Sequence, residues 1–172
     1  MVARCSGVAD VVAGINLARQ HNLVLAVRGG GHNVSGSGVC DGGLVIDLSA
    51  MNAVRVDQKR GIVQVQGGAT LADVDRETQM FGMATTTGNV STTGIGGLTL
   101  GGGFGNLRRK FGLGVDNFVS AEVVTANGEV IRADTSENPD LFWREFRSCH
   151  LLRFPTSSLG ARGHVRGSVL SH

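Results

Sequence analysis

The sequence predicts an α+β fold, and three patterns support this prediction: an amphipathic helix near the start, a buried aliphatic strand directly after it, and two β-hairpins farther along. The 172 residues suffice for one domain or two small lobes with a hydrophobic core that needs no disulfides. We place lobe one at about residues 1–81 and lobe two at about residues 82–143, and we assign no fold to residues 144–172.

Lobe one begins with a helix from Gly7 to His21, for which Ser6 is the expected N-cap. The apolar positions of this segment are spaced for one helical face and are Val8, Val11, Val12, Ile15 and Ala18. The aliphatic run Leu23–Val27 follows as a buried strand, and Leu44–Leu48 predicts another strand. We therefore expect an α+β arrangement here rather than a βαβ unit.

The rest of lobe one is predicted as a hairpin and a helix. Residues 54–56 and 62–66 alternate apolar and polar side chains on either side of a polar turn, as paired antiparallel strands do. Thr70 is the expected N-cap of a helix from Leu71 to about Phe81. Asp73 lies in the first turn, where the helix dipole favours a carboxylate.

Lobe two begins with small residues and continues with a hairpin and a helix. Residues 82–105 show no useful apolar period but offer hydroxyls and unobstructed N–H groups, which suit phosphate oxygens. Residues 118–125 and 129–133 flank Asn127-Gly128, a pair typical of a type I′ turn. Residues 138–143 begin a helix, with Asn138 or Asp140 near its cap and Pro139 in its first turn.

The glycines are concentrated in two places. Of 27 glycines, seven lie between Gly29 and Gly43 and eleven lie between Gly82 and Gly114, where they alternate with aliphatic residues instead of serines. A flexible linker has the opposite composition. Because glycine permits close backbone approach, we interpret the two clusters as ordered loops that contact one ligand. The alternative is a pair of glycine-rich connecting loops that bind no ligand.

The composition excludes several other classes of protein. The formal charge of +2 arises from interleaved acidic and basic residues and predicts neither nucleic-acid nor membrane-surface binding. Cys5, Cys40 and Cys149 are too few and too scattered for a disulfide framework or a zinc site. No export signal or membrane span is indicated, so a cytoplasmic location is the expectation.

Two common nucleotide-binding motifs are missing from the glycine clusters. The dinucleotide fingerprint requires G-x-G-x-x-G between a strand and a helix, and neither cluster contains it. A phosphate-binding P-loop requires a lysine directly after its last glycine, whereas Lys59 and Lys110 do not occupy that frame. Two separated glycine loops instead suggest a long ligand whose pyrophosphate contacts backbone from both sides.

The chain resembles the FAD-binding domain of the vanillyl-alcohol oxidase or p-cresol methylhydroxylase (PCMH) type, nearest the berberine-bridge-enzyme-like oxidoreductases. The resemblance covers roughly Arg4 to Trp143 and rests on five blocks in the family order. These blocks are Val27–Asn33 (VRGGGHN), Cys40–Leu48, Gln66–Thr70, Ser91–Gly105 and Asn138–Trp143. It implies a two-lobed PCMH-type FAD-binding domain that is incomplete at both ends.

The resemblance also implies a set of FAD-binding residues. These are Arg28, Gly29, Gly30, Gly31, His32, Asn33, Gly88, Ser91, Thr92, Thr93, Gly94 and Gly97. His32 matches the position that bonds covalently to the 8α-methyl carbon of the flavin. From the residues alone, we favour a loop histidine that only hydrogen-bonds over a lone metal ligand. We expect no metal site because no further ligands lie nearby.

Some relatives attach the flavin a second time, through a cysteine in the second glycine loop. Val90 occupies that position in this chain, and none of the three cysteines matches the missing ligand. We therefore expect a single attachment, through His32.

The chain departs from the family pattern at both ends. Met1–Arg4 matches the middle of the first strand, and the sequence after Trp143 loses both its periodicity and the resemblance. We interpret residues 144–172 as a frameshifted or foreign tail; the alternative is a diverged native terminus. The family's substrate-binding domain, which often supplies a tyrosine as catalytic base, is expected to be missing, and this chain contains no tyrosine.

The leading hypothesis is an FAD-dependent oxidoreductase in which an alcohol- or amine-type substrate gives a hydride to covalently bound flavin, and dioxygen reoxidises the flavin. A small-molecule substrate and dioxygen are thus the expected partners, while catalytic residues and oligomeric state are left unassigned. The first alternative is a non-catalytic flavin-binding fragment or pseudoenzyme. The second is a binding module that keeps the fold without flavin.

Overall fold

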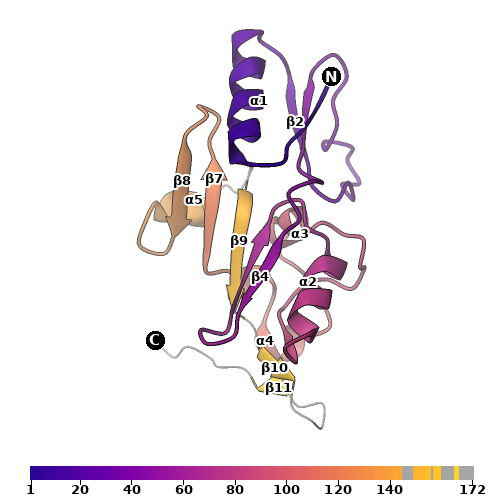
Figure 1. Cartoon of the computed structure of the whole chain (residues 1–172), viewed down its shortest axis with the longest axis vertical. Helices are drawn as coiled ribbons and strands as arrows, with labels where there is room; N and C mark the ends of the chain where they lie inside the picture. The colour runs from indigo at the N-terminus through magenta and orange to yellow at the C-terminus, as the bar shows by residue number, and fades with distance from the viewer. Residues whose placement is uncertain (145–148, 156, 160–164, 167–172) are drawn as a thin grey trace.

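The computed structural model describes residues 1–144, 149–155, 157–159 and 165–166. Figure 1 shows an elongated molecule with α1 at one end and the small β10–β11 pair at the other. In chain order the elements are β1 (Val2–Arg4), α1 (Val8–Gln20), β2 (Leu25–Arg28), β3 (Leu44–Asp47), β4 (Val54–Asp57), β5 (Ile62–Gln66), α2 (Leu71–Gln79), β6 (Met83–Ala84), α3 (Ile95–Leu100), α4 (Arg108–Phe111), the 3-10 turn η1 (Val115–Asn117), β7 (Ser120–Val124), β8 (Val130–Asp134), α5 (Pro139–Arg144), β9 (Cys149–Pro155), β10 (Ser157–Leu159) and β11 (Val165–Arg166).

The first sheet is parallel and has the order β1-β3-β2. Helix α1 connects β1 to β2, so the segment is a βαβ unit with β3 inserted between its strands, and the expectation of no βαβ unit was wrong. Strand β3 is buried along its length, whereas β2 is an edge strand in which Leu25 is half-exposed. The prediction of a buried strand at 23–27 was therefore also wrong, because an aliphatic run does not distinguish a central strand from an edge strand.

Helix α1 begins one residue later than expected. Its N-cap is Gly7, in an extended conformation, and not Ser6. The backbone N–H and the hydroxyl of Ser6 both donate to the carboxylate of Asp10 at 2.8 Å. These bonds, with the N–H of Gly7, hold the pKa of Asp10 below its usual range. The Asp10 carboxylate thus reaches back to the N–H of the N-cap Gly7, which is the acidic half of a capping box.

The second sheet is antiparallel in every pairing and has the order β4-β5-β9-β7-β8. Both predicted hairpins, β4–β5 and β7–β8, are confirmed. The predicted type I′ turn is wrong, because Gly128 has φ +80° whereas Asn127 is not among the described residues with positive φ. The N–H of Gly128 donates to Thr125, and the N–H of Thr125 donates to Glu129, which is the longer hairpin loop with glycine in the left-handed position.

The predicted cap of α2 is present. The Thr70 hydroxyl accepts a bond from the N–H of Asp73, and the Asp73 carboxylate accepts bonds from the N–H and hydroxyl of Thr70 at 2.9 and 2.8 Å. This reciprocal pair fixes the start of α2, which ends at Gln79 and not near Phe81. Helix α5 begins at Pro139, directly after Asn138.

The sequence did not predict the strands after residue 144. Strand β9 lies in the middle of the five-stranded sheet, between β5 and β7, and β10 pairs with β6 and β11. The β4–β5 hairpin, expected in lobe one, therefore joins β7–β8 through β9, so strand pairing runs across the expected boundary near residue 81. Residues 145–148, 156, 160–164 and 167–172 of the unassigned tail lie outside the described residues, and the frameshift interpretation stays a prediction.

Two hydrophobic clusters fill the interior. One packs α1 on the parallel sheet and consists of Cys5, Val11, Ile15, Ala18, Leu44, Ile46, Leu48, Met51 and Val124. The other packs α2, α3 and α5 on the antiparallel sheet and consists of Val63, Val65, Ala69, Leu71, Val74, Ile95, Phe118, Ala121, Val123, Ala133 and Phe142. The loops that join the two clusters position the candidate site.

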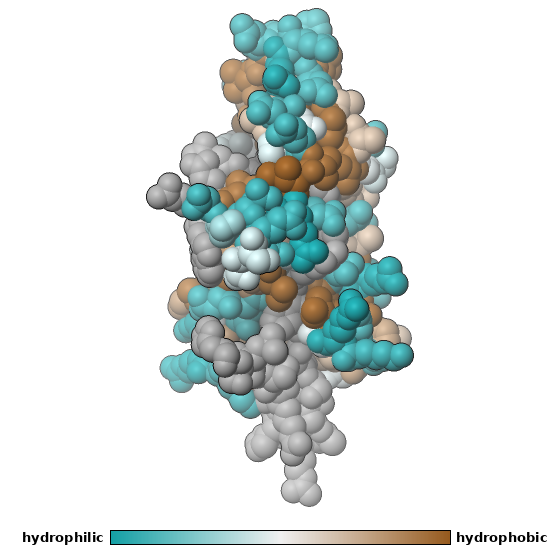
Figure 2. All heavy atoms as spheres, turned by 90° about the vertical axis from the view of Figure 1, so that its left-hand side faces the viewer, coloured by the Kyte–Doolittle hydropathy of each residue, from teal (hydrophilic) through white to brown (hydrophobic). Residues whose placement is uncertain are grey.

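The outer surface is mixed in character. Figure 2 shows hydrophobic side chains between hydrophilic ones on the face that it presents. Apolar side chains at single exposed positions, such as Leu17 on α1 and Val130 on β8, are ordinary for a folded protein. Within the part of the chain that the structure describes, no helix has the length and apolar character needed to cross a membrane.

Candidate functional site

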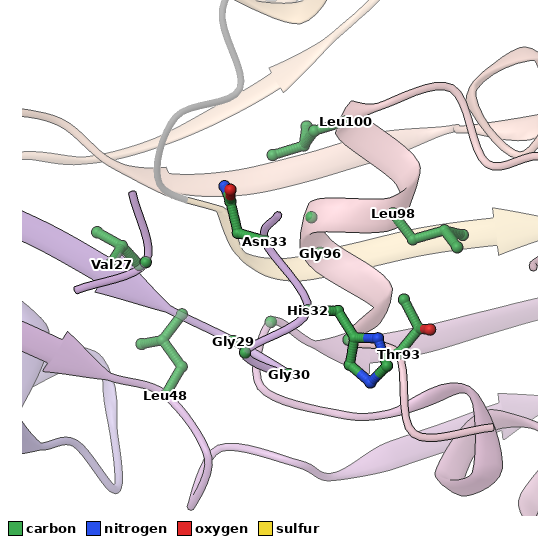
Figure 3. Close-up of a pocket in the computed structure, with 15 residues that line it drawn as sticks. Val27, Gly29, Gly30, His32, Asn33, Leu48, Thr93, Gly96, Leu98 and Leu100 are labelled. Carbon is green, nitrogen blue, oxygen red and sulfur yellow. The ribbon is translucent and has the colours of Figure 1, made fainter. Parts of the chain in front are cut away.

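A cavity of about 300 Å³ lies between the two glycine-rich loops, at the carboxyl ends of the parallel strands β2 and β3. This is the edge at which parallel sheets usually bind ligands. The described residues that line it are Val27, Gly29, Gly30, Gly31, His32, Asn33, Gly38, Leu48, Gly67, Thr93, Gly94, Gly96, Gly97, Leu98 and Leu100. Figure 3 shows the loop of Gly29, Gly30 and His32 alongside α3 and Thr93. Apart from the ionisable His32, none of these lining residues carries a formal charge.

The two glycine loops touch each other through their backbones. A Cβ at Gly30 would overlap the backbone nitrogen of Gly94, and a Cβ at Gly94 would overlap the backbone nitrogen of Gly30. A Cβ at either Gly29 or Gly96 would lie 3.1 Å from the carbonyl oxygen of Gly67. Several glycines of this region are therefore required by contact between loops, before any ligand is considered.

The second loop is held in place by the start of α2. The N–H of Leu71 donates to Thr93, the N–H of Ala72 donates to Ser91, and the N–H of Ile95 donates to Ala69, each at 2.9 Å. Because these backbone bonds tie three residues of the loop to residues 69–72, they fix the path of its backbone. The loop then enters α3 directly, so the first turn of this helix faces the first glycine loop.

Gly97 differs from the glycines at the loop crossing. A Cβ at this position would meet no atom within 4 Å, so its wall of the cavity is open. Gly96 and Gly97 are the second and third residues of α3, and helix geometry gives their N–H groups no partner within the helix. This wall of the cavity therefore carries no side chain at Gly96 or Gly97, and the N–H groups of both residues have no partner within the helix.

Arg28 lies beneath the first loop and not in the cavity wall. Its Nη1 atom lies 3.2 Å from Oδ2 of Asp47, a buried carboxylate at the end of β3. Burial raises the pKa of Asp47. The N–H and hydroxyl of Ser49 and the guanidinium of Arg28 lower it by more than burial raises it, so the pKa of Asp47 lies below its usual range. A Cβ at Gly31 would lie 3.2 Å from Nε of Arg28. Arg28 thus supports the loop, and its charge is balanced by Asp47.

The amide of Asn33 is occupied within its own loop. Its Oδ1 accepts bonds from the N–H and hydroxyl of Ser35 at 2.8 and 2.7 Å, and its Nδ2 donates to Ser37 at 2.8 Å. This is a side-chain-stabilised turn. Asn33 lines the cavity but does not offer it an unengaged amide.

His32 projects from the first loop toward the second. Its Nε2 atom lies 2.9 Å from the hydroxyl oxygen of Thr92, and both residues are exposed. Figure 3 shows the ring beside Thr93. The predicted attachment residue therefore lies at the rim of the cavity.

The structure brings most of the predicted cofactor-binding residues together. Those that line the cavity are Gly29, Gly30, Gly31, His32, Asn33, Thr93, Gly94 and Gly97. Arg28, Gly88, Ser91 and Thr92 are not among its lining residues. Gly88 packs on Leu98, where a Cβ would approach the leucine side chain to 2.5 Å.

Sequence reasoning missed several lining residues: Val27, Gly38, Leu48, Gly67, Gly96, Leu98 and Leu100. The two glycine pairs Gly67-Gly68 and Gly96-Gly97 were visible signals, since each follows a strand or opens a helix. Within the described residues, no three His, Cys, Asp or Glu side chains gather closely enough to hold a metal ion. Cys5 is buried and Cys40 is partly buried, and both are free thiols.

Comparison with known proteins assigns this geometry to a family. The family model described as "FAD binding domain" matches residues 1–134. The sequence is 40% identical over 143 residues to (R)-6-hydroxynicotine oxidase of Paenarthrobacter nicotinovorans, a match that covers 83% of this chain and 31% of that protein.

Solved structures show the same relationship. The crystal structure of 6-hydroxy-D-nicotine oxidase from Arthrobacter nicotinovorans superposes with a TM-score of 0.87 at 36% identity, over 90% of this chain and 36% of that chain. Glucooligosaccharide oxidase from Acremonium strictum, which carries a 6-S-cysteinyl, 8α-N1-histidyl FAD, superposes with a TM-score of 0.85 at 29% identity, over 90% and 34% of the two chains. The chain thus spans about a third of the length of these relatives.

The ion pair between the half-exposed Arg28 side chain and the buried Asp47 carboxylate predicts a pH-dependent stability difference. Replacing Asp47 by Asn should lower the free energy of unfolding by about 1–3 kcal/mol at pH 7, because the guanidinium of Arg28 loses its counter-charge. A carboxylate with a lowered pKa stabilises the fold above its unfolded pKa of ~3.9, and this contribution disappears as the pH falls through the lower folded value. The difference between the wild-type chain and Asp47→Asn should therefore shrink below pH ~3.9.

Urea unfolding followed by circular dichroism at pH 7 and at acidic pH measures this difference, with Asp41→Asn at an exposed position as the matched control. A deficit of the Asp47→Asn variant that stays constant with pH would contradict the role of the ion pair.

The loop crossing predicts opposite effects for two Gly→Ala substitutions. Gly30→Ala should destabilise the chain by about 1–3 kcal/mol, because the new methyl group overlaps backbone that has no rotamer to relieve it. Gly97→Ala should leave stability unchanged or raise it by up to about 1 kcal/mol, because alanine is the better helix former and the position is open. Thermal unfolding of both variants measures the contrast; equal midpoints would show that the loops separate at no cost.

Proposed function

The chain belongs to the FAD-binding domain family, and on this premise we propose that the cavity between its two glycine loops binds the pyrophosphate of FAD. The proposal includes the role of the chain as the cofactor-binding part of an FAD-dependent oxidoreductase. Bound flavin would accept a hydride from an alcohol- or amine-type substrate and pass the electrons to dioxygen. The chain's residues bind and orient the cofactor for that reaction.

The observation that carries this proposal is the neutral wall formed by Gly96 and Gly97, which is open at Gly97. A diphosphate binds well to backbone N–H groups that face it without side chains in between. Because Arg28 is paired with Asp47, its charge is not required for this binding. The residues present therefore fit a pyrophosphate held by backbone donors.

His32 is proposed as the covalent attachment residue. It lies at the rim of the cavity with its imidazole exposed, so a bound ring system reaches it without passing through packed side chains. A neutral imidazole nitrogen is a competent nucleophile. Val90 stands where some relatives have a cysteine, so a single attachment is the proposal for this chain.

The substrate side of the reaction rests on relatives that are about three times longer. These relatives are oxidases named for hydroxynicotine and for glucooligosaccharides. For this chain we propose only the class of substrate, which is small organic alcohols or amines. A flavin-binding chain without turnover is the competing function, and it shares the same cofactor site.

Replacement of the proposed attachment residue gives a direct test. The purified chain incubated with FAD and then precipitated with acid should stay yellow, and His32→Ala should lose the colour to the supernatant while it still binds FAD before denaturation. His21→Ala, at an exposed histidine beyond the end of α1, is the matched control and should stay yellow. A wild-type chain that remains colourless after incubation with FAD would refute the proposed cofactor.

Anaerobic reduction distinguishes an enzyme from a flavin-binding chain. The FAD-loaded chain should be bleached by dithionite and recover its colour in air. We expect 6-hydroxynicotine and glucose oligomers to leave it unbleached, because the described residues around the cavity supply backbone donors and no charged base apart from His32. Bleaching by either compound would show that this chain alone oxidises a substrate.

A further inference from the structure

The hydrogen bond between His32 and Thr92 links the two glycine loops through side chains. His32 lines the cavity, whereas Thr92 is not among its lining residues and has its hydroxyl oxygen 2.9 Å from Nε2 of His32. The partners are 60 residues apart in sequence, so the bond forms only when the loops cross as they do at Gly30 and Gly94. Thr92 therefore contacts the ring of the proposed attachment residue, although it does not line the cavity itself.

We propose that Thr92 is a positioning residue that holds His32 in the tautomer with a proton on Nε2 and so presents Nδ1 as the atom that bonds to the flavin. This inference rests on the proposed function of the cavity. In a neutral imidazole one nitrogen carries the proton and the other carries the lone pair, and the partner of one nitrogen decides the role of the other. A threonine hydroxyl can accept from Nε2–H or donate to Nε2. In the proposed direction Nε2–H donates, and the lone pair is on Nδ1.

The surrounding backbone makes Thr92 a rigid partner. The N–H of Thr93 donates to Val90, and the carbonyls of Ser91 and Thr93 accept bonds from the first turn of α2. Thr92 is thus held between two anchored neighbours, whereas the exposed ring of His32 would otherwise rotate about its side-chain bonds. Fixing the ring lowers the entropic cost of reaching the attack geometry.

The attachment reaction balances with dioxygen as oxidant. A bond forms between Nδ1 of His32 and the 8α carbon, the carbon loses one hydrogen, and the imidazole loses its proton from Nε2. The two hydrogens and two electrons released in total reduce dioxygen to hydrogen peroxide. Thr92 is exposed and its Oγ1 is hydrogen-bonded to Nε2, so this oxygen lies on the route by which that proton reaches solvent.

Two substitutions separate the hydroxyl from the shape of the side chain. Thr92→Val keeps the branched shape but removes the hydrogen-bonding oxygen, and Thr92→Ser keeps the oxygen. Thr92→Val should slow covalent incorporation of FAD by about tenfold or more, as loss of an orienting partner of a histidine does elsewhere, while Thr92→Ser stays close to the wild-type rate. Denaturing gels read by flavin fluorescence over time measure the rate, and circular dichroism checks that each variant is folded.

The tautomer and the linkage give readouts that a merely structural role would not change. In the cofactor-free chain, nitrogen chemical shifts of the His32 ring should report the Nε2–H tautomer, and Thr92→Val should shift the ring toward a mixture of tautomers. Magnetic resonance of the isolated flavin peptide should show attachment through Nδ1 in the wild-type chain. His21 provides the unperturbed reference ring in the same spectra.

Two outcomes would overturn the proposal: an Nδ1–H tautomer of His32 in the wild-type chain, or a Thr92→Val variant with the wild-type attachment rate and linkage. If neither the wild-type chain nor Thr92→Ser acquires covalent flavin, the proposed attachment at His32 fails. The tautomer measurement requires no flavin and still decides whether Thr92 controls the ring. Failure of the cofactor proposal and failure of the positioning proposal are thereby distinguished.

Discussion

Direct contact between the backbones of Gly30 and Gly94 is the constraint on which the candidate site depends. It brings the loop after the parallel sheet against the loop that enters α3, and α3 packs on the hydrophobic cluster of the antiparallel sheet. The two hydrophobic clusters are thus connected at the place where the cavity opens. A side chain on either glycine would separate the loops and would also part His32 from Thr92.

The electrostatic character of the site follows from the same arrangement. Asp47 holds Arg28 beneath the first loop, and the described cavity wall carries no formal charge other than that of an ionisable His32. In the proposed pyrophosphate site, selectivity for an anion would fall to N–H groups, whose positions are fixed by the backbone. Such donors need no reorganisation of flexible side chains on binding, so one glycine pattern would account for both the crossing of the loops and the proposed anion site.

Local sequence patterns predicted the elements that depend on local physics. The amphipathic helix α1, both hairpins and the reciprocal cap of Thr70 and Asp73 follow from periodicity and short-range hydrogen bonds. Strand β9 did not follow, because its pairing with β5 and β7 is set by neighbours far away in sequence. The turn at Asn127-Gly128 was misjudged in type because the same pair fits more than one hairpin loop.

By itself, the sequence predicted that two glycine clusters and His32 belong to one cofactor site, because the residue types and their order are readable without a fold. Only the tertiary structure decided what each glycine does: Gly30 and Gly94 serve contact between loops, and Gly97 leaves the cavity wall open. It also decided that Arg28 and Asn33 are engaged within the protein, and that Thr92 meets Nε2 of His32. The physical reason is that these contacts join residues from different loops, and their partners are fixed by how the sheets pack rather than by any local pattern.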